Sequence, residues 1–312
     1  MPVWVDEDVR PWIPGGAAGD TTFARPNRLA VSELVEGDLW ARAGGPLNAD
    51  ILLTLVYDST LSRVRITATG MEVFTLATVE RSTDQITWTT VRGGEALSVA
   101  AGTLKLDDYE FAPNVTNYYR VRTLVPFGQS TVGSISPTLT DVWFKSVARP
   151  FLNLAVSLLG NKFEFERRDR GGRFPIVGRS LPVAVTDVRG SRAYTITIRT
   201  DTDNASNDLD LLLASGDTLF LHAPPGKVVP AGGVFVSAGR VTAESPAPPA
   251  QLRFTSVDLT EVAAPAADVV GATSTWQTVI NTYATWADVI AAKASWSELL
   301  DVVAEPDEVV VP

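Results

Sequence analysis

The 312-residue sequence predicts a mainly β protein with two β-rich domains, an extended N-terminal arm and short C-terminal helices. Three observations carry this prediction. Short segments of alternating apolar and polar residues recur between turn residues, a second β-rich stretch contains one helical segment, and a ten-residue repeat lies near the end of the chain. We expect the four parts at residues 1–47, 48–142, 143–262 and 263–312.

The expected arm at 1–47 is interrupted by Pro and Gly, so neither a helical nor a strand period persists in it. Trp4, Trp12 and Trp40 nevertheless lie there, which a free linker does not need. The arm either packs these side chains on its own domain or reaches a neighbouring subunit, and the sequence leaves both possibilities open.

The second part, 48–142, reads as a β-sandwich. Its strand candidates are residues 51–57, 63–69, 78–82, 86–91 and 117–124. Trp88 in an early strand and Tyr118 and Tyr119 in a late one, preceded by residues 108–113, resemble the aromatic pattern of a fibronectin type III-like module. About seven short strands in a segment of this length are typical of such a sandwich.

The third part, 143–262, is predicted to be a second β-barrel or sandwich domain with one inserted helix. Its strand candidates are residues 162–166, 182–188, 193–199, 218–221, 233–237 and 252–257. The helix is expected at residues 206–214, because polar residues open the segment and Gly216 closes it. A Pro-rich stretch at 246–249 is expected to be a loop between the last two strands.

The last part, 263–312, contains Trp276, Trp286 and Trp296 in related units spaced by ten residues. Ten residues on one continuous helix turn through about 1000°, so the three Trp side chains would not share a stripe. Thr or Ser precedes each Trp, and the third residue beyond it is Thr, Asp or Glu, which is a capping-box pattern in two of the three units. We therefore expect three short helices, each beginning at its Trp and covered either by the body of the chain or by another protein.

Composition excludes several kinds of chemistry. Without Cys the chain has no disulfide framework, zinc finger, iron–sulfur cluster or thiol nucleophile, and it has a single His. The net charge of -10 argues against general nucleic-acid binding. No apolar run is long enough for a membrane span and the N-terminal residues do not resemble a signal peptide, so we expect a soluble, unexported chain without membrane partners.

No pattern in the sequence points to an active site. His222 follows a probable strand and is expected to be structural rather than a catalytic base. The acidic run from Asp201 to Asp210 fails the EF-hand pattern, because Ser206 replaces the required Gly and Leu212 replaces the required Glu. We expect no enzyme activity, no cofactor and no metal.

Charge is distributed unevenly along the chain. Residues 145–199 contain eleven basic and four acidic side chains, whereas residues 258–312 contain nine acidic side chains and one basic. The densest basic cluster is Arg167, Arg168, Arg170 and Arg173. We expect this cluster to meet an acidic patch on a neighbouring copy, because opposite patches set the register between subunits. Nucleic acid as the partner and a solvated basic surface are the alternatives.

Three passages resemble the minor tail proteins (tail tip or distal tail components) of siphophages that infect actinobacteria. They are the Trp repeat, residues 174–180 followed by 185–189, and residues 211–216 followed by 223–226. The resemblance implies a structural virion protein of the tail tip or baseplate, assembled in the host cytoplasm. It also implies other tail proteins as partners (tail tube, hub, tape measure) and a homo-oligomer, either a trimer or a hexamer.

Two functions follow as hypotheses. The leading one is a structural tail protein that docks on its neighbours through Trp276, Trp286 and Trp296 and the Trp-bearing arm. The alternative is a module of the tail that binds a host cell-surface saccharide, in which an aromatic face of Trp4, Trp12 or Trp40 stacks on a sugar ring.

Overall fold

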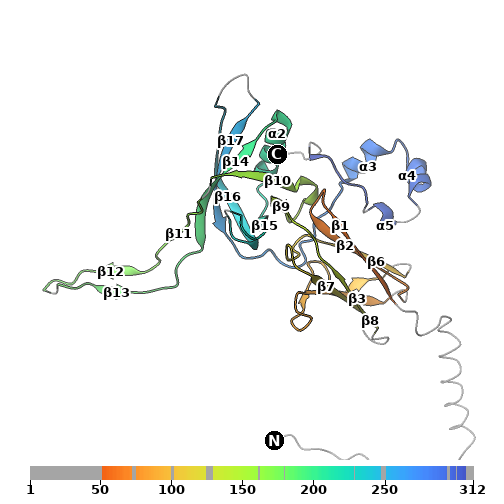
Figure 1. Cartoon of the computed structure of the whole chain (residues 1–312), viewed down its shortest axis with the longest axis horizontal. Coiled ribbons are helices and arrows are strands. Elements are labelled where there is room, and N and C mark those ends of the chain that lie inside the picture. The colour runs from red at the N-terminus through yellow and green to blue at the C-terminus, as the bar shows by residue number, and fades with distance from the viewer. Residues whose placement is uncertain are drawn as a thin grey trace, which may run out of the picture. The chain divides into compact units, whose positions relative to one another are not determined.

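A computed structural model of the chain describes most of it beyond residue 50 (Figure 1). The described ranges are 51–71, 75–99, 102–123, 129–160, 162–178, 180–227, 229–246, 251–293, 296–299 and 301–306. Within them, antiparallel strands dominate and short helices lie near the C-terminus, which confirms the predicted fold class. The expected arm at 1–47, with Trp4, Trp12 and Trp40, lies outside these ranges.

The first β-rich region is a sandwich of two antiparallel sheets. One sheet has the strand order β1–β2–β6, and the other has the order β4–β3–β7–β8, with β5 also paired to β3. Their bounds are β1 Leu52–Asp58, β2 Arg63–Thr69, β3 Leu76–Ser82, β4 Thr89–Thr90, β5 Leu97–Ser98, β6 Thr103–Asp108, β7 Asn117–Thr123 and β8 Ser130–Ile135. Alternate residues such as Val64, Ile66, Val79 and Val121 point between the sheets and form one core.

The strand expected at 86–91 is shorter than predicted, because only β4 is extended there. The Asp84 carboxylate accepts hydrogen bonds from the backbone amides of Ile86 and Thr87, each at 2.8 Å, and so takes donors that a strand would use. Trp88 therefore lies just before the strand, where the guanidinium of Arg120 covers its ring at 4.2 Å. The alternating pattern predicted a strand but missed this local competition for the backbone.

The second β-rich region is a closed barrel. Six antiparallel strands follow the order β10–β9–β15–β16–β17–β14, and β14 pairs again with β10 to complete the ring. Their bounds are β9 Val142–Ser146, β10 Leu154–Leu159, β14 Arg192–Thr200, β15 Leu219–Ala223, β16 Gly232–Glu244 and β17 Arg253–Glu261, with a 3₁₀ turn η1 at Pro150–Leu152. Closure settles the choice between barrel and sandwich that the sequence leaves open.

Helix α2, Asp203–Ala214, connects β14 to β15 and contributes buried Leu209 and Leu212 to the core shared with the barrel. It begins earlier than the expected Ser206, because the Thr202 hydroxyl accepts a hydrogen bond from the amide of Ala205 at 3.1 Å. Side chains from all six strands fill the same core, as in other small barrels.

A long excursion between β10 and β14 differs from the sequence expectation. The strand expected at 162–166 is reduced to β11, Glu166–Arg167. In the described residues it pairs only with the first residues of β14. The strand expected at 182–188 is β13, Val183–Val185, which pairs with β12, Gly172–Phe174, as a separate two-stranded sheet. In Figure 1 this hairpin extends away from the barrel strands.

The C-terminal helices are α3 Trp276–Thr282, α4 Trp286–Ala292 and α5 Trp296–Leu299, each beginning at a Trp as the repeat predicts. Thr275 and Thr285 form complete capping boxes with Thr278 and Asp288. No helix in the described part of the chain has the length and apolar character needed to cross a lipid bilayer.

We predict that Gly233→Ala destabilises the barrel. A Cβ built on Gly233 would lie 1.9 Å from Cζ of Phe220, which is 6 % exposed and packs on Phe235 and His222. The ring must move, so we expect a loss of about 1–3 kcal/mol in the free energy of unfolding, measured by urea denaturation. Gly239→Ala on the same strand is the control, because its Cβ would make ordinary contacts from 3.4 Å outward. Equal stabilities of the two variants would contradict the steric argument.

Candidate functional site

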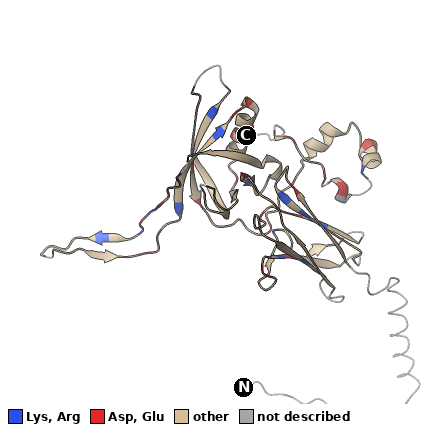
Figure 2. Cartoon of the chain, in the orientation of Figure 1, with Lys and Arg blue, Asp and Glu red and all other residues tan. Residues whose placement is uncertain are grey.

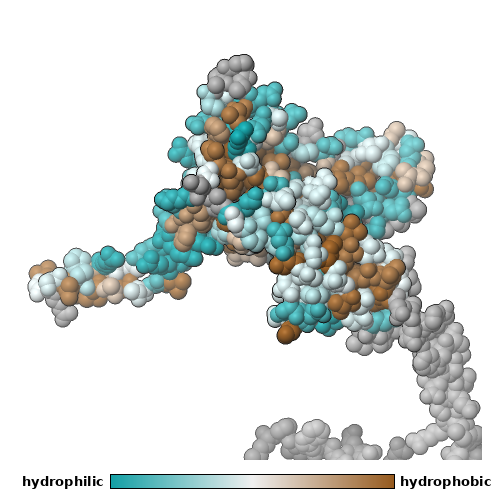
Figure 3. Space-filling model, in the orientation of Figure 1, coloured by the Kyte–Doolittle hydropathy of each residue, from teal (hydrophilic) through white to brown (hydrophobic). Residues whose placement is uncertain are grey.

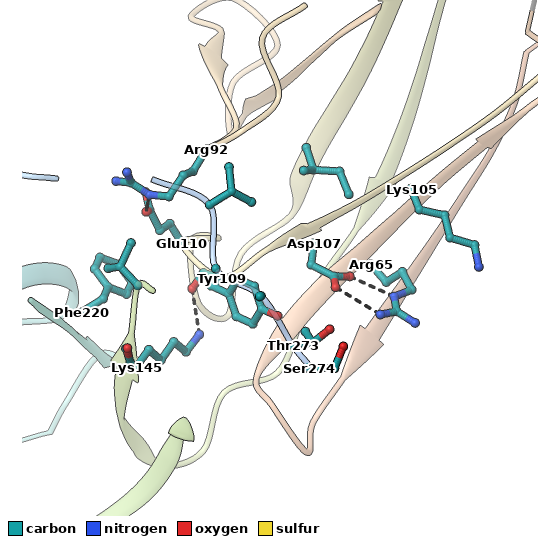
Figure 4. A pocket seen from close by; sticks show the side chains of 16 residues that line it. Arg65, Arg92, Lys105, Asp107, Tyr109, Glu110, Lys145, Phe220, Thr273 and Ser274 are labelled. Atoms are coloured by element: carbon teal, nitrogen blue, oxygen red, sulfur yellow. Dashed lines mark hydrogen bonds and ion pairs between the residues drawn. The ribbon is translucent and has the colours of Figure 1, made fainter. Parts of the chain in front are cut away.

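The sandwich and the barrel meet at the buried side chain of Lys145, which β9 carries (Figure 4). Its Nζ donates to the carbonyl oxygens of Ser62 at 2.5 Å and Tyr109 at 2.8 Å, both in the sandwich. The third contact of Nζ is with Nδ1 of His222 on β15, at 2.9 Å. One side chain of the barrel therefore satisfies two backbone acceptors of the sandwich.

This arrangement satisfies Lys145 in either protonation state. An ammonium donates to all three acceptors, whereas a neutral amine donates to the two carbonyls and accepts from Nδ1–H of His222. Burial lowers the pKa of Lys145 well below its usual range. Burial and the charge of Lys145 together lower the pKa of His222 from 6.5 to about 2, so the imidazole is neutral near pH 7.

A cavity of about 200 Å³ lies beside this junction and is closed on one side by residues 270–274 (Figure 4). Three of the four basic side chains that line it already have acidic partners, and the fourth, Lys145, donates to the two carbonyls described above. Arg65 binds Asp107 at 2.9 Å, Arg92 binds Glu110 at 2.6 Å, and Lys105 reaches Asp301 at 3.3 Å. Because these cations are paired inside the protein, the cavity is better suited to holding the domains together than to binding a substrate anion.

The segment that follows β17 runs along this junction and is held there by its backbone. Ala267 accepts a hydrogen bond from the amide of Gly93 at 3.1 Å, and the amide of Ala272 donates to Ala148 at 3.3 Å. A Cβ on Gly271 would lie 2.4 Å from Cγ of Pro150, so only glycine fits this close approach. The C-terminal helices therefore start from a fixed point.

The far end of the helical segment is fixed as well. The carboxylate of Asp301 accepts from Arg65 at 2.5 Å and from Lys105 at 3.3 Å, and the amide of Ala304 donates to Thr273 at 2.9 Å. The described residues between 274 and 299 thus belong to a loop of helices whose two ends are anchored on the same body.

This loop exposes an aromatic surface. We call the set Trp276, Ile280, Trp286 and Ile290 the tryptophan surface. The two indole rings meet edge to face with centroids 6.0 Å apart and are 63 % and 56 % exposed. In each helix the Trp and the Ile lie four residues apart on one face, whereas Val279 and Val289 point inward and are buried.

Trp296 begins α5 as expected, but its side chain lies outside what the structure describes. The structure therefore brings together Trp276 and Trp286 among the predicted docking residues. It leaves Trp4, Trp12 and Trp40 outside the described ranges.

The basic cluster lies along the excursion that carries the hairpin (Figure 2). Arg167 is in β11 and donates to the carbonyl of Gly190 at 3.2 Å, while the side chain of Arg168 is 87 % exposed. Arg170 lies in the connection and Arg173 in β12, and both are exposed. The cluster is thus on a projecting element and not on the barrel wall.

The sequence does not single out Lys145, and it does not predict the hairpin as a unit. Two weak signals for the hairpin are present, namely the pair Gly171-Gly172 at the start of β12 and Pro182 before β13. No known protein-family model matches the chain, and no curated protein has significant sequence similarity to it. The exposed surfaces are therefore the strongest guide to its function.

The pKa of His222 leads to a testable pH dependence. The folded protein holds this imidazole neutral, whereas the unfolded chain protonates it below about pH 6.5. The contribution of His222 to the free energy of unfolding is complete above about pH 6.5 and is lost as the pH falls toward about 2. Between about pH 6 and 5 we expect the free energy of unfolding to fall by up to about 1.4 kcal/mol per pH unit.

This slope is measured by urea denaturation at several pH values, with Trp fluorescence as the signal that reports unfolding. The variant His222→Gln removes the only His of the chain, so its slope in the same window should be smaller than that of the wild type by the contribution of His222, and any remaining slope belongs to other buried groups such as Lys145. An unchanged slope in the variant would assign the proton uptake to another group.

Proposed function

We propose that this protein is a structural component of a phage tail, at the tail tip or baseplate, and that it docks on neighbouring tail subunits through the tryptophan surface. The observation that carries the proposal is the exposed pair Trp276 and Trp286 on a loop anchored at both ends. The sequence resemblance to minor tail proteins of actinobacterial siphophages gives the class of particle.

The physical properties of the tryptophan surface suit docking. Trp is enriched among the residues that dominate binding energy at protein interfaces. The capping boxes of α3 and α4 and the anchor at Asp301 hold the surface in place, so little conformational entropy is lost when a partner covers it. Trp276 and Trp286 contact each other, and a contiguous exposed apolar patch, unlike a single exposed residue, is typical of an interaction site.

The proposed partners are other tail proteins (tail tube, hub or tape measure) and further copies of this chain as a trimer or hexamer. The proposed location is the virion tail, after assembly in the host cytoplasm. Neither a cofactor nor catalysis is part of the proposal, because the function consists of contact between surfaces.

Saccharide binding by Trp4, Trp12 or Trp40 stays a separate prediction, since those residues lie outside the described ranges. Binding of the purified protein to host cell-wall material, lost on Trp→Ala substitution at those positions, would support it over docking.

We predict that Trp276→Ser combined with Trp286→Ser leaves a folded protein that no longer enters particles. Both side chains are largely exposed, so their loss removes little from the core. Each anchor at an interface contributes about 2 kcal/mol or more, so we expect at least an about 30-fold loss of incorporation, measured by quantitative immunoblotting of purified particles.

The matched control is Ile86→Ser, which removes an apolar side chain that is 84 % exposed on a sandwich loop. This variant should enter particles normally. Normal incorporation of the double Trp variant, with an unchanged circular dichroism spectrum, would rule out the docking role.

A further inference from the structure

The β12–β13 hairpin has one apolar face and no partner for it among the described residues. Phe174 lies opposite Val183 and Gly172 lies opposite Val185, and residues two apart in a strand share a face. A Cβ on Gly172 would lie 2.7 Å from Cε2 of Phe174, so this glycine makes room for the ring. Phe174, Val183 and Val185 therefore form a continuous surface, and they are 56 %, 42 % and 57 % exposed.

An isolated two-stranded hairpin is marginally stable in water, because it cannot bury an apolar face by itself. Ile176, Val177 and Leu181 near the tip are also exposed. Figure 3 shows apolar residues along the hairpin, interspersed with polar ones. The free edges of both strands add unpaired backbone groups. The hairpin thus has the properties of an element that is completed by a partner.

The charge of the hairpin restricts what that partner is. Residues 166–189 contain six arginines and three carboxylates. Two hairpins meeting face to face would bring like charges together, which is unfavourable. A partner with an apolar surface and an excess of acid fits better.

The tryptophan surface has both properties. Residues 262–306 contain five acidic side chains and one basic. One of the five, Asp301, is already paired with Arg65 and Lys105, and Figure 2 shows acidic residues on α4 and α5. The apolar contacts of the tryptophan surface come from Trp276, Ile280, Trp286 and Ile290. These side chains are exposed within a single chain, and so are the apolar side chains of the hairpin. Neither surface covers the other in the monomer.

We propose that the apolar face of the β12–β13 hairpin of one copy packs on the tryptophan surface of a second copy. The contact is heterologous, because two different surfaces meet, and its repetition generates a ring or an open filament. The arginines of the hairpin then lie near the acidic residues of α4 and α5 and set the register. This inference rests on the proposed function, for which it names the partner of the tryptophan surface.

The test uses two variants of the full chain. The hairpin variant is Phe174→Ser with Val185→Ser, and the tryptophan variant is Trp276→Ser with Trp286→Ser. We expect wild-type protein to form species larger than a monomer at tens of micromolar, and each variant alone to dissociate at least about 30-fold more readily, by analytical ultracentrifugation. Higher salt should weaken the association, because the contact pairs opposite charges.

Mixing the two variants distinguishes a heterologous contact from a symmetric one. Each variant keeps the half that the other has lost, so an equal mixture should form 1:1 dimers and nothing larger. Failure of the mixture to form dimers, or oligomerisation of the hairpin variant as efficient as that of the wild type, would overturn the proposal.

The two proposals can fail separately. If the wild-type chain is monomeric while the tryptophan variant is still excluded from particles, the tryptophan surface binds another tail protein and only this inference is wrong. If self-association behaves as expected but the tryptophan variant enters particles normally, the proposed function is wrong instead.

Discussion

The structure depends on the contacts of one buried side chain, Lys145. A basic group taken out of water is costly unless every one of its hydrogen-bonding positions is used. Here two positions are used by carbonyls of the sandwich and one by His222 of the barrel, so the cost is met only when the two domains are joined as observed. Separating the two domains would take from Nζ of Lys145 the two sandwich carbonyls to which it donates.

This junction also explains why the C-terminal segment has a fixed path. Residues 270–274 close the cavity beside Lys145, and the backbone bonds to Gly93 and Ala148 connect the segment to both domains. The ion pairs of Asp301 with Arg65 and Lys105 return the chain to the sandwich after the helices. The tryptophan surface is therefore held by the same rigid junction that Lys145 organises, and rigidity of this kind lowers the entropic cost of binding.

Local chemistry made some features predictable from the sequence. Each of the helices α3 and α4 begins at a capping Thr, and the residue that completes the capping box lies three positions further along the chain. Both residues of each box can be read from the sequence. The alternation of inward-facing and outward-facing residues along β2 and β7 is likewise a local property that can be read from the sequence. Lys145 was not predictable, because its partners Ser62, Tyr109 and His222 are 83, 36 and 77 residues away. The hairpin escaped prediction because strands of three residues are too short to establish a period.

Adjacent positions in the Trp repeat separate the demands of folding from those of contact. Val279 and Val289 are buried, whereas Ile280 and Ile290, one residue further on, are 65 % and 73 % exposed. Helix formation does not require Ile or Trp at exposed positions, since both have lower helix propensity than Ala, Glu or Lys. Burial in the body of the chain does not require them either, because they are not buried. An apolar residue that serves neither purpose, and that recurs in two successive units on the same face as the Trp, is best explained by a surface that covers both units at once.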